Sequence, residues 1–397
     1  MSTAVMSSDP RQRERLRPLE RLSFVSTLAG APWGGSEELW AAVAREAASR
    51  GLPTTAGVQR WPIVPVKLSS LVDLGVRVDF RAPDRLSLVR RLLNRVHRRP
   101  SPIARQLQHA TGDLIAISLS TAFDLADDPD SCRILRDFKI PYVLIVQHNF
   151  EEPVRQAWRG PAREVFGRAA LNCFVSANNL LALERQIAAA VPKAIVVQNP
   201  INLPNYSPVA WPSCDEARFA CIGRLDVRFK GQDVLLHVLA SERWKNRSWR
   251  LSLYGSGSDE LHLRSLAAHY SIADRVRFCG HRSDVSQIWA EEQILIMPSR
   301  SEGTPLALIE AIVASRPAIV TNVGDSARWV EDGATGFTTE ACNSNSIKGA
   351  LEAAWESRAD WQAMGERARR HFSPLIDQQP AKTLLDAILK VGSRHVS

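Results

Sequence analysis

Several absences narrow what this sequence can be. Its six cysteines include no C-x-x-C pair, so neither a zinc site nor a disulfide framework is indicated. No stretch approaches the roughly 18 uninterrupted apolar residues of a membrane-spanning helix. Residues 1–20 are polar and arginine-rich and lack the apolar region of a secretory signal. No repeat of fixed period and no complete G-x-G-x-x-G fingerprint are found. We therefore expect a cytoplasmic globular protein that begins with a tail.

Length and charge indicate two domains. A chain of 397 residues is too long for one ordinary core. Residues 1–200 hold 27 Lys and Arg against 19 Asp and Glu, whereas residues 201–397 hold 23 of each. The net charge of +8 therefore lies in the first half, and the two halves are expected to face different partners.

Short apolar runs alternate with helical patterns along the whole chain. Such an alternation predicts parallel sheets covered on both faces, the doubly wound α/β class. The expected strands are 22–28, 114–119, 142–146, 172–175, 194–197, 218–222, 250–254, 275–278, 294–297 and 318–321, and the clearest helices are 232–240, 261–269 and 306–315.

A stretch rich in proline and asparagine, 199–212, has no periodicity and is predicted to be a linker. It divides the chain into a tail over 1–20, an N-terminal domain over 21–205 and a C-terminal domain over 206–375. A terminal helix and tail over 376–397 could pack on either domain. Open α/β sheets bind ligands beyond the carboxyl ends of their strands, so the cleft between the domains is the expected site.

The loop from Gly223 to Gly231 holds three cations, among them Arg224 and Lys230. A helix is expected to begin near Gly231, where further positive charge is unfavourable unless an anion is bound. An anion site and a solvated basic loop partly neutralised by Asp226 and Asp233 remain equal alternatives here.

The segment after the strand 294–297 reads Pro-Ser-Arg-Ser-Glu-Gly-Thr-Pro. Thr304 is a suitable N-cap and Pro305 a suitable first helical residue. Gly303 permits close approach of a ligand to the backbone. Glu302 and Glu310 could bind sugar hydroxyls and a vicinal diol. Alternatively, Glu302 favours the helix dipole and Glu310 is an exposed helical residue.

Taken together, these elements resemble the retaining glycosyltransferases of family four, which have the two-domain GT-B fold. The resemblance is strong over residues 217–340 and looser towards the ends. It runs through IGRLDVRFKGQDVLLHVLA, LYGSGSDELHLRSLAA and RVRFCGHRSDVSQIWAEEQILIMPSRSEGTPLALIEAIVASRPAIVTNVGDSARWVEDGATGF. Its most specific part is the combination of two glutamates eight residues apart with the preceding Arg and Lys.

The resemblance implies a role for each matching residue. Arg224 and Lys230 would bind the donor diphosphate and stabilise it as it leaves. Glu310 would hold the ribose and Glu302 the donor hexose, while the backbone of Gly303, Thr304, Pro305 and Leu306 would complete the cradle. His281 would lie near the base.

In the first half, Gly34 and Gly35 follow the first strand, and Ser36 is expected to cap a helix whose dipole suits the next two glutamates. The glycines either let the backbone approach the donor or form an ordinary turn. His148 lies at the end of the strand that runs from Tyr142 to Gln147. The resemblance places a histidine here at the donor sugar or the reaction centre, and the alternative is a loop histidine bonded to backbone.

A basic amphipathic segment, Arg81–Arg99, contains seven arginines and a single acid. It could contact an anionic membrane or acceptor, or pack its apolar face in the core. Asp128-Pro129-Asp130 spells the D-x-D metal motif of a different glycosyltransferase fold, but it lies in an acidic loop, and we expect no required metal and no cofactor.

The resemblance implies a retaining, metal-independent hexosyltransferase that uses a UDP- or GDP-linked sugar. The acceptor is not identified; a glycan or a lipid-linked molecule are candidates. The enzyme would be cytoplasmic, with or without contact to the inner face of a membrane, and no nucleic-acid partner is expected. One departure is Asn199-Pro200-Ile201-Asn202, where the family often has Asn-Gly-(Val/Ile)-Asp. A nucleotide-sugar epimerase, a phosphorylase and a non-catalytic protein that binds membranes or nucleic acid are the alternatives.

Overall fold

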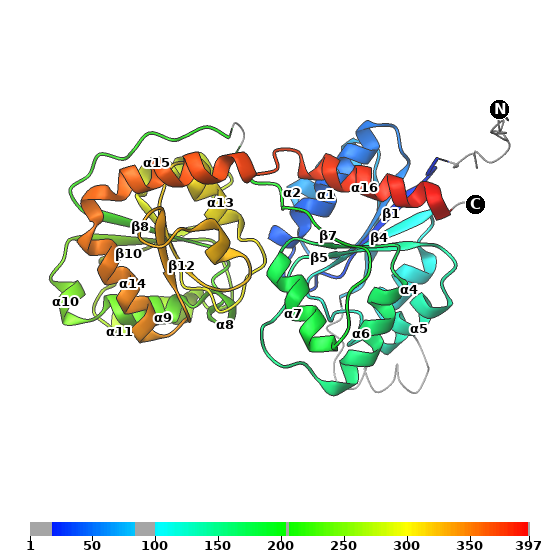
Figure 1. Cartoon of the computed structure of the whole chain (residues 1–397), viewed down its shortest axis with the longest axis horizontal. Helices are drawn as coiled ribbons and strands as arrows, with labels where there is room; N and C mark the ends of the chain where they lie inside the picture. The colour runs from blue at the N-terminus through cyan, green and yellow to red at the C-terminus, as the bar shows by residue number, and fades with distance from the viewer. Residues whose placement is uncertain (1–17, 84–99, 204–205, 396–397) are drawn as a thin grey trace, which may run out of the picture.

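Two parallel β-sheets, each with helices on both faces, form two domains that lie side by side (Figure 1). This computed structural model describes residues 18–83, 100–203 and 206–395. The predicted doubly wound α/β architecture with two Rossmann-like domains is confirmed.

The N-terminal sheet has the strand order β3-β2-β1-β4-β5-β6-β7, and all its neighbours are parallel. Its strands are β1 (Leu22–Ser26), β2 (Thr54–Gln59), β3 (Arg77–Arg81), β4 (Leu114–Leu119), β5 (Tyr142–Val146), β6 (Leu171–Phe174) and β7 (Ala194–Val196). The helices are α1 (Gly35–Ser49), α2 (Val66–Asp73), α4 (Pro102–His109), α5 (Pro129–Asp137), α6 (Gln156–Arg168) and α7 (Ala177–Ile187).

The C-terminal sheet repeats this winding in the order β10-β9-β8-β11-β12-β13. Its strands are β8 (Ala217–Ile222), β9 (Trp249–Tyr254), β10 (Val276–Gly280), β11 (Ile294–Met297), β12 (Ala318–Thr321) and β13 (Gly336–Thr339). The helices are α8 (Val227–Lys230), α9 (Gln232–Leu239), α10 (Glu242–Lys245), α11 (Glu260–His269), α12 (Val285–Glu291), α13 (Leu306–Val313), α14 (Ser344–Glu356) and α15 (Trp361–Phe372), with short 3-10 turns η2 (Ser326–Trp329), η3 (Arg358–Asp360) and η4 (Ser373–Leu375).

The central strands are the ones that the apolar pattern predicted. Every residue of β4 and β5 is buried, because one face packs under α1 and the other under α5 and α6. The pattern missed β2, β3 and β13. Two of these strands, β3 and β13, lie at sheet edges, and all three are polar or short, so no continuous apolar run marks them.

The chain crosses between the domains twice. After the linker it builds the C-terminal domain, and after η4 it returns in α16 (Pro380–His395), which lies against α1 of the N-terminal domain (Figure 1). Leu384, Leu385 and Ile388 of α16 are completely buried in the core cluster that contains α1, and Arg50 pairs with Asp386 at 2.8 Å. The terminal helix is therefore part of the N-terminal domain. Among the described helices, none combines the length and apolar character needed to cross a membrane.

Candidate functional site

The segment that follows β11 carries Glu302, which is buried although it is charged. Its Oε1 accepts hydrogen bonds from Lys230 Nζ at 2.5 Å and from Ser299 Oγ at 2.6 Å. Both partners keep Oε1 in place, and Oε2 accepts no hydrogen bond from a described residue. The sequence predicted that Glu302 and Lys230 belong to one site, and the structure brings them into direct contact.

The helix α9 begins at Gln232 with Gly231 as its N-cap, as expected, but Lys230 does not lie in an open loop. It is the last residue of the short helix α8, and Gly231 then separates α8 from α9. A cation is favourable at a helix C-terminus, so the position of Lys230 is explained by that helix and by Glu302 without a bound anion. Arg224, in contrast, is about half exposed, and its nearest carboxylate, Asp226, is 4.0 Å away.

The segment that carries Glu302 is hydrogen-bonded to the segment 229–233, which contains Lys230. Arg300 donates from both terminal guanidinium nitrogens, Nη1 and Nη2, to Asp233 at 2.9 Å. Its backbone N–H donates to the carbonyl of Phe229 at 2.8 Å. Bidentate pairing of this kind fixes orientation as well as distance. Lys230 and Glu302 therefore keep their relative positions in this domain.

His148 reaches the same point from the N-terminal domain, two residues beyond the end of β5. Its Nε2 lies 2.7 Å from Ser301 Oγ, and its ring meets Phe150 and Phe229 edge to face at 5.1 and 6.2 Å. Burial lowers the pKa of the imidazole to about 4; Glu302 opposes this shift, and Lys230 adds to it. The imidazole is thus neutral at physiological pH. It bonds to a side chain of the opposite domain and not to backbone.

Of the two glycines at the start of α1, Gly35 faces the C-terminal domain. A methyl group at Gly35 would lie 3.5 Å from Leu306 Cδ1, at the start of α13. Gly34, and not Ser36, is the N-cap of α1. Glu37 is buried and accepts a hydrogen bond from Ser26 Oγ at 2.9 Å, so it does more than complement the helix dipole.

Thr304 and Pro305 do not start the next helix as expected. The helix α13 begins at Leu306 with Pro305 as its N-cap. The Thr304 hydroxyl instead donates to the carbonyl of Val175, across the domain boundary, at 2.6 Å. A buried carbonyl requires a partner, and the hydroxyl supplies it. Gly303 beside it is needed for close packing, because a Cβ there would lie 2.5 Å from the Gln147 carbonyl oxygen.

Glu310 is buried, so the alternative of an exposed helical glutamate is wrong. Its Oε1 accepts from the backbone N–H of Asn202 at 3.0 Å and from Asn202 Nδ2 at 3.2 Å. Burial raises the pKa of the Glu310 carboxyl, and the two hydrogen bonds oppose that rise. Asn202 belongs to the linker, so the departure from the family pattern at Pro200 leaves this contact in place.

Some predicted residues are not bonded to this cluster. His281 is exposed, and no hydrogen bond, ion pair or ring contact joins it to the residues above within the described part of the chain. Asp128 is not a free acid, because it caps α5 and accepts from Ser101 Oγ and Ser131 Oγ, both at 2.5 Å. No cluster of three potential metal ligands occurs within 18–83, 100–203 and 206–395.

Of the basic segment Arg81–Arg99, residues 84–99 lie outside the described residues. Arg81 ends β3 and is buried, with hydrogen bonds to the carbonyls of Ser26 and Leu28. It therefore does not belong to a solvated basic face.

Sequence analysis gave no site role to Ser299, Arg300, Ser301 and Asn202. The first three directly precede the predicted Glu302, so their position was a usable signal. Asn202 gave none, since its partner Glu310 is 108 residues away. Asp233 was expected to neutralise the basic loop, and in the structure it pairs with Arg300.

Comparison with known proteins identifies the second domain. Residues 216–357 match the family of glycosyl transferases group 1. The match lies within the C-terminal domain. The chain is 35% identical over 116 residues to an uncharacterized glycosyltransferase of Haemophilus influenzae, covering 29% of this chain and 33% of that protein. It is 30% identical over 160 residues to the D-inositol 3-phosphate glycosyltransferase of Corynebacterium diphtheriae, covering 38% and 37%. These alignments span about a third of the length of the relatives.

Solved structures extend the likeness to the whole chain. Anabaena HepE in complex with UDP-glucose superposes with a TM-score of 0.72 at 18% identity, covering 93% of this chain and 99% of that one. WaaG, a glycosyltransferase involved in lipopolysaccharide biosynthesis, gives 0.67 at 16% identity, covering 92% and 99%. Both domains thus share the GT-B fold.

Proposed function

We propose that this protein is a retaining, metal-independent glycosyltransferase that moves a hexose from a UDP- or GDP-linked sugar to a hydroxyl acceptor. The observation that carries the proposal is the meeting of Lys230, Glu302 and His148 at the carboxyl ends of strands from both sheets. The neighbour HepE was solved with UDP-glucose, which supports a nucleotide-sugar donor here.

The charges of the cluster suit departure of a nucleoside diphosphate. Arg224 and Lys230 would face the diphosphate and stabilise the negative charge that develops as the bond to the sugar breaks. Lys230 would then exchange part of its contact with Glu302 for a phosphate oxygen. Glu310 would hold the ribose hydroxyls with Oε2, since Asn202 already occupies Oε1.

The anomeric carbon gains positive charge in such a reaction. A neutral imidazole at His148 avoids repulsion with that charge, and its low pKa keeps it neutral. Glu302 would accept a hydrogen bond from a sugar hydroxyl through Oε2. In the retaining step the bond from the anomeric carbon to the phosphate oxygen breaks, and the acceptor oxygen bonds on the same face. The acceptor proton passes to the departing phosphate.

The acceptor would approach from the N-terminal domain, which carries the excess positive charge. A hollow lined by Trp33, Trp61 and Phe80 lies next to Gly34 and Gly35. Ile63 and Val66 near it are 80% and 85% exposed. The exposed apolar side chains and the net positive charge of the N-terminal half support an acceptor that is anionic or lipid-linked, with peripheral contact to a membrane.

Titration calorimetry of the full chain with UDP and with GDP, with and without EDTA, tests the donor site. We expect one nucleotide to bind equally well with and without EDTA. Lys230→Ala should abolish that binding, whereas Lys348→Ala, an exposed lysine on α14, should leave it unchanged. Absence of binding by either nucleotide to the folded protein would contradict the proposal. A product formed from the donor without any acceptor would favour an epimerase.

A further inference from the structure

Asp325, in the loop between β12 and η2, caps a helix of the opposite domain. Its carboxylate is buried and accepts hydrogen bonds from Ser176 Oγ at 2.9 Å, from the N–H of Ala177 at 3.0 Å and from the N–H of Asn178 at 3.1 Å. These residues form the N-terminus of α7. A carboxylate is the group that a helix N-terminus favours, because the dipole is positive there.

The cap is complete only while the domains are together. Ser176 itself accepts from the N–H of Asn179 at 3.1 Å through Oγ and from that of Leu180 at 3.3 Å through its carbonyl. The two remaining amide donors of this turn are those that Asp325 accepts. Separation of the domains would return these donors and the carboxylate to water, so the contact favours the docked arrangement.

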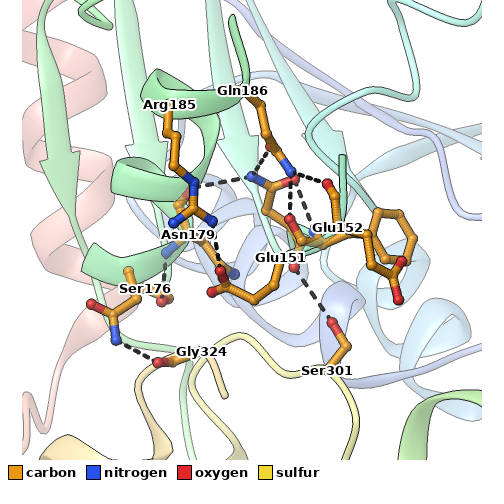
Figure 2. A network of polar contacts seen from close by, with 11 residues as sticks. Glu151, Glu152, Ser176, Asn179, Arg185, Gln186, Ser301 and Gly324 are labelled. Atoms are coloured by element: carbon orange, nitrogen blue, oxygen red, sulfur yellow. Dashed lines mark hydrogen bonds and ion pairs between the residues drawn. The ribbon is translucent and has the colours of Figure 1, made fainter. Parts of the chain in front are cut away.

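The loop that carries Asp325 also contacts the segment that carries Glu302. The N–H of Asp325 donates to the carbonyl of Gly303 at 3.1 Å. Gly324 has φ +56°, and a Cβ there would lie 2.4 Å from the carbonyl oxygens of both Glu302 and Gly303. The Gly324 carbonyl accepts from Asn178 Nδ2 at 2.6 Å, and Figure 2 shows these facing segments.

At its other end α7 holds the loop that carries His148. Gln186 Nε2 donates to the carbonyls of Phe150 at 2.6 Å and Glu152 at 2.9 Å. Gln186 Oε1 accepts from Asn149 Nδ2 at 2.9 Å, so both the oxygen and the nitrogen of the Gln186 amide bond the loop to α7 (Figure 2). A movement of α7 would therefore move His148 relative to Glu302.

We propose that Asp325 is a positioning residue for the transfer reaction. By capping α7 it docks the loop of His148 against the segment of Glu302. The inference rests on the proposed function. Arg224 and Lys230 both belong to the C-terminal domain, so nucleotide affinity does not depend on this docking, whereas turnover does.

Asp325→Ala and Asp325→Asn, each as the full chain, test the inference together with a matched control. Asp332→Ala also removes a carboxylate that accepts a backbone N–H, that of Thr338 at 2.7 Å, but within one domain. For Asp325→Ala we expect a larger radius of gyration in small-angle X-ray scattering and nucleotide affinity within about twofold of the unmodified chain. Release of nucleotide from its hexose conjugate should fall about 100-fold, as for a small misplacement of reacting groups. Asp325→Asn keeps one acceptor oxygen, so its radius of gyration and its turnover should lie between those of Asp325→Ala and the unmodified chain. Asp332→Ala should match the unmodified chain in both quantities.

Two results would overturn the inference. One is unchanged scattering and turnover in Asp325→Ala. The other is a parallel loss of nucleotide affinity and thermal stability in both Asp325 variants, which would mean that the residue supports only the fold. If the unmodified chain binds neither UDP nor GDP, the proposed function fails, while the scattering comparison still reports whether Asp325 docks the domains.

Discussion

At the scale of single residues, the site depends on which oxygen of each glutamate is already used. Glu302 and Glu310 both keep Oε1 occupied by protein donors, Lys230 and Ser299 for the first and Asn202 for the second. The spacing of the two glutamates and the Arg-Lys loop was visible in the sequence. The donors that orient the carboxylates were not, because a hydrogen bond between distant segments leaves no local pattern.

Glu310→Gln should weaken binding of the nucleoside diphosphate about 10- to 100-fold, the range for a lost hydrogen bond to a charged group. The single carbonyl oxygen of the glutamine is required by Asn202, so an amide that donates would face the ribose. Calorimetry with UDP or GDP measures the loss. The 2′,3′-dideoxy nucleotide is the control, since it should bind the variant and the unmodified chain equally; an equal loss for both nucleotides would contradict the ribose role.

At the scale of elements, the start of α1 differs from its sequence prediction, and a carboxyl group is buried in its first turn. A serine followed by two glutamates is typical of an exposed helix start. The chain begins the helix two residues earlier, at the glycines, and buries Glu37 under Ser26. Burial is the main cause that raises the pKa of Glu37 to about 7 from 4.5.

Glu37→Gln should therefore stabilise the protein at alkaline pH. Between pH 4.5 and 7 the folded state binds more protons at Glu37 than the unfolded state, so stability falls as the pH rises through this window. The full effect above pH 7 is up to roughly 3 kcal/mol. Urea unfolding should show the variant to be more stable than the unmodified chain at pH 8 and similar to it at pH 4.5. Glu38→Gln, which removes a carboxylate paired with Lys67, should give no gain at pH 8.

At the scale of the whole molecule, the two domains are held by contacts that pass beside the site. Thr304 donates to Val175, Ser301 bonds to His148, and Gly303 packs on the Gln147 carbonyl. The segment that carries Glu302 is thus also a docking surface.

Gly303→Ala should act as a wedge. The added methyl carbon would lie 2.5 Å from the Gln147 carbonyl oxygen, so the domains must separate slightly. We expect nucleotide affinity to change little and turnover to fall about 100-fold. Gly349→Ala on α14 is the matched control, because nothing lies within 4 Å of its added carbon. Normal turnover in Gly303→Ala would show that the domains need not meet this closely.

The sequence by itself determined the fold class and singled out Lys230, Glu302 and His148, which the structure brings together. Continuous apolar strands can be stable only when covered on both faces, and their alternation with helices leaves few topologies. Edge strands such as β3 were missed, because a strand whose residues are mostly exposed carries no continuous apolar run. Only the tertiary structure decided that α16 belongs to the N-terminal domain, that Asn202 orients Glu310 and that Asp325 caps α7. These contacts join segments more than 100 residues apart, and their energy depends on distances and burial that exist only once both domains have folded.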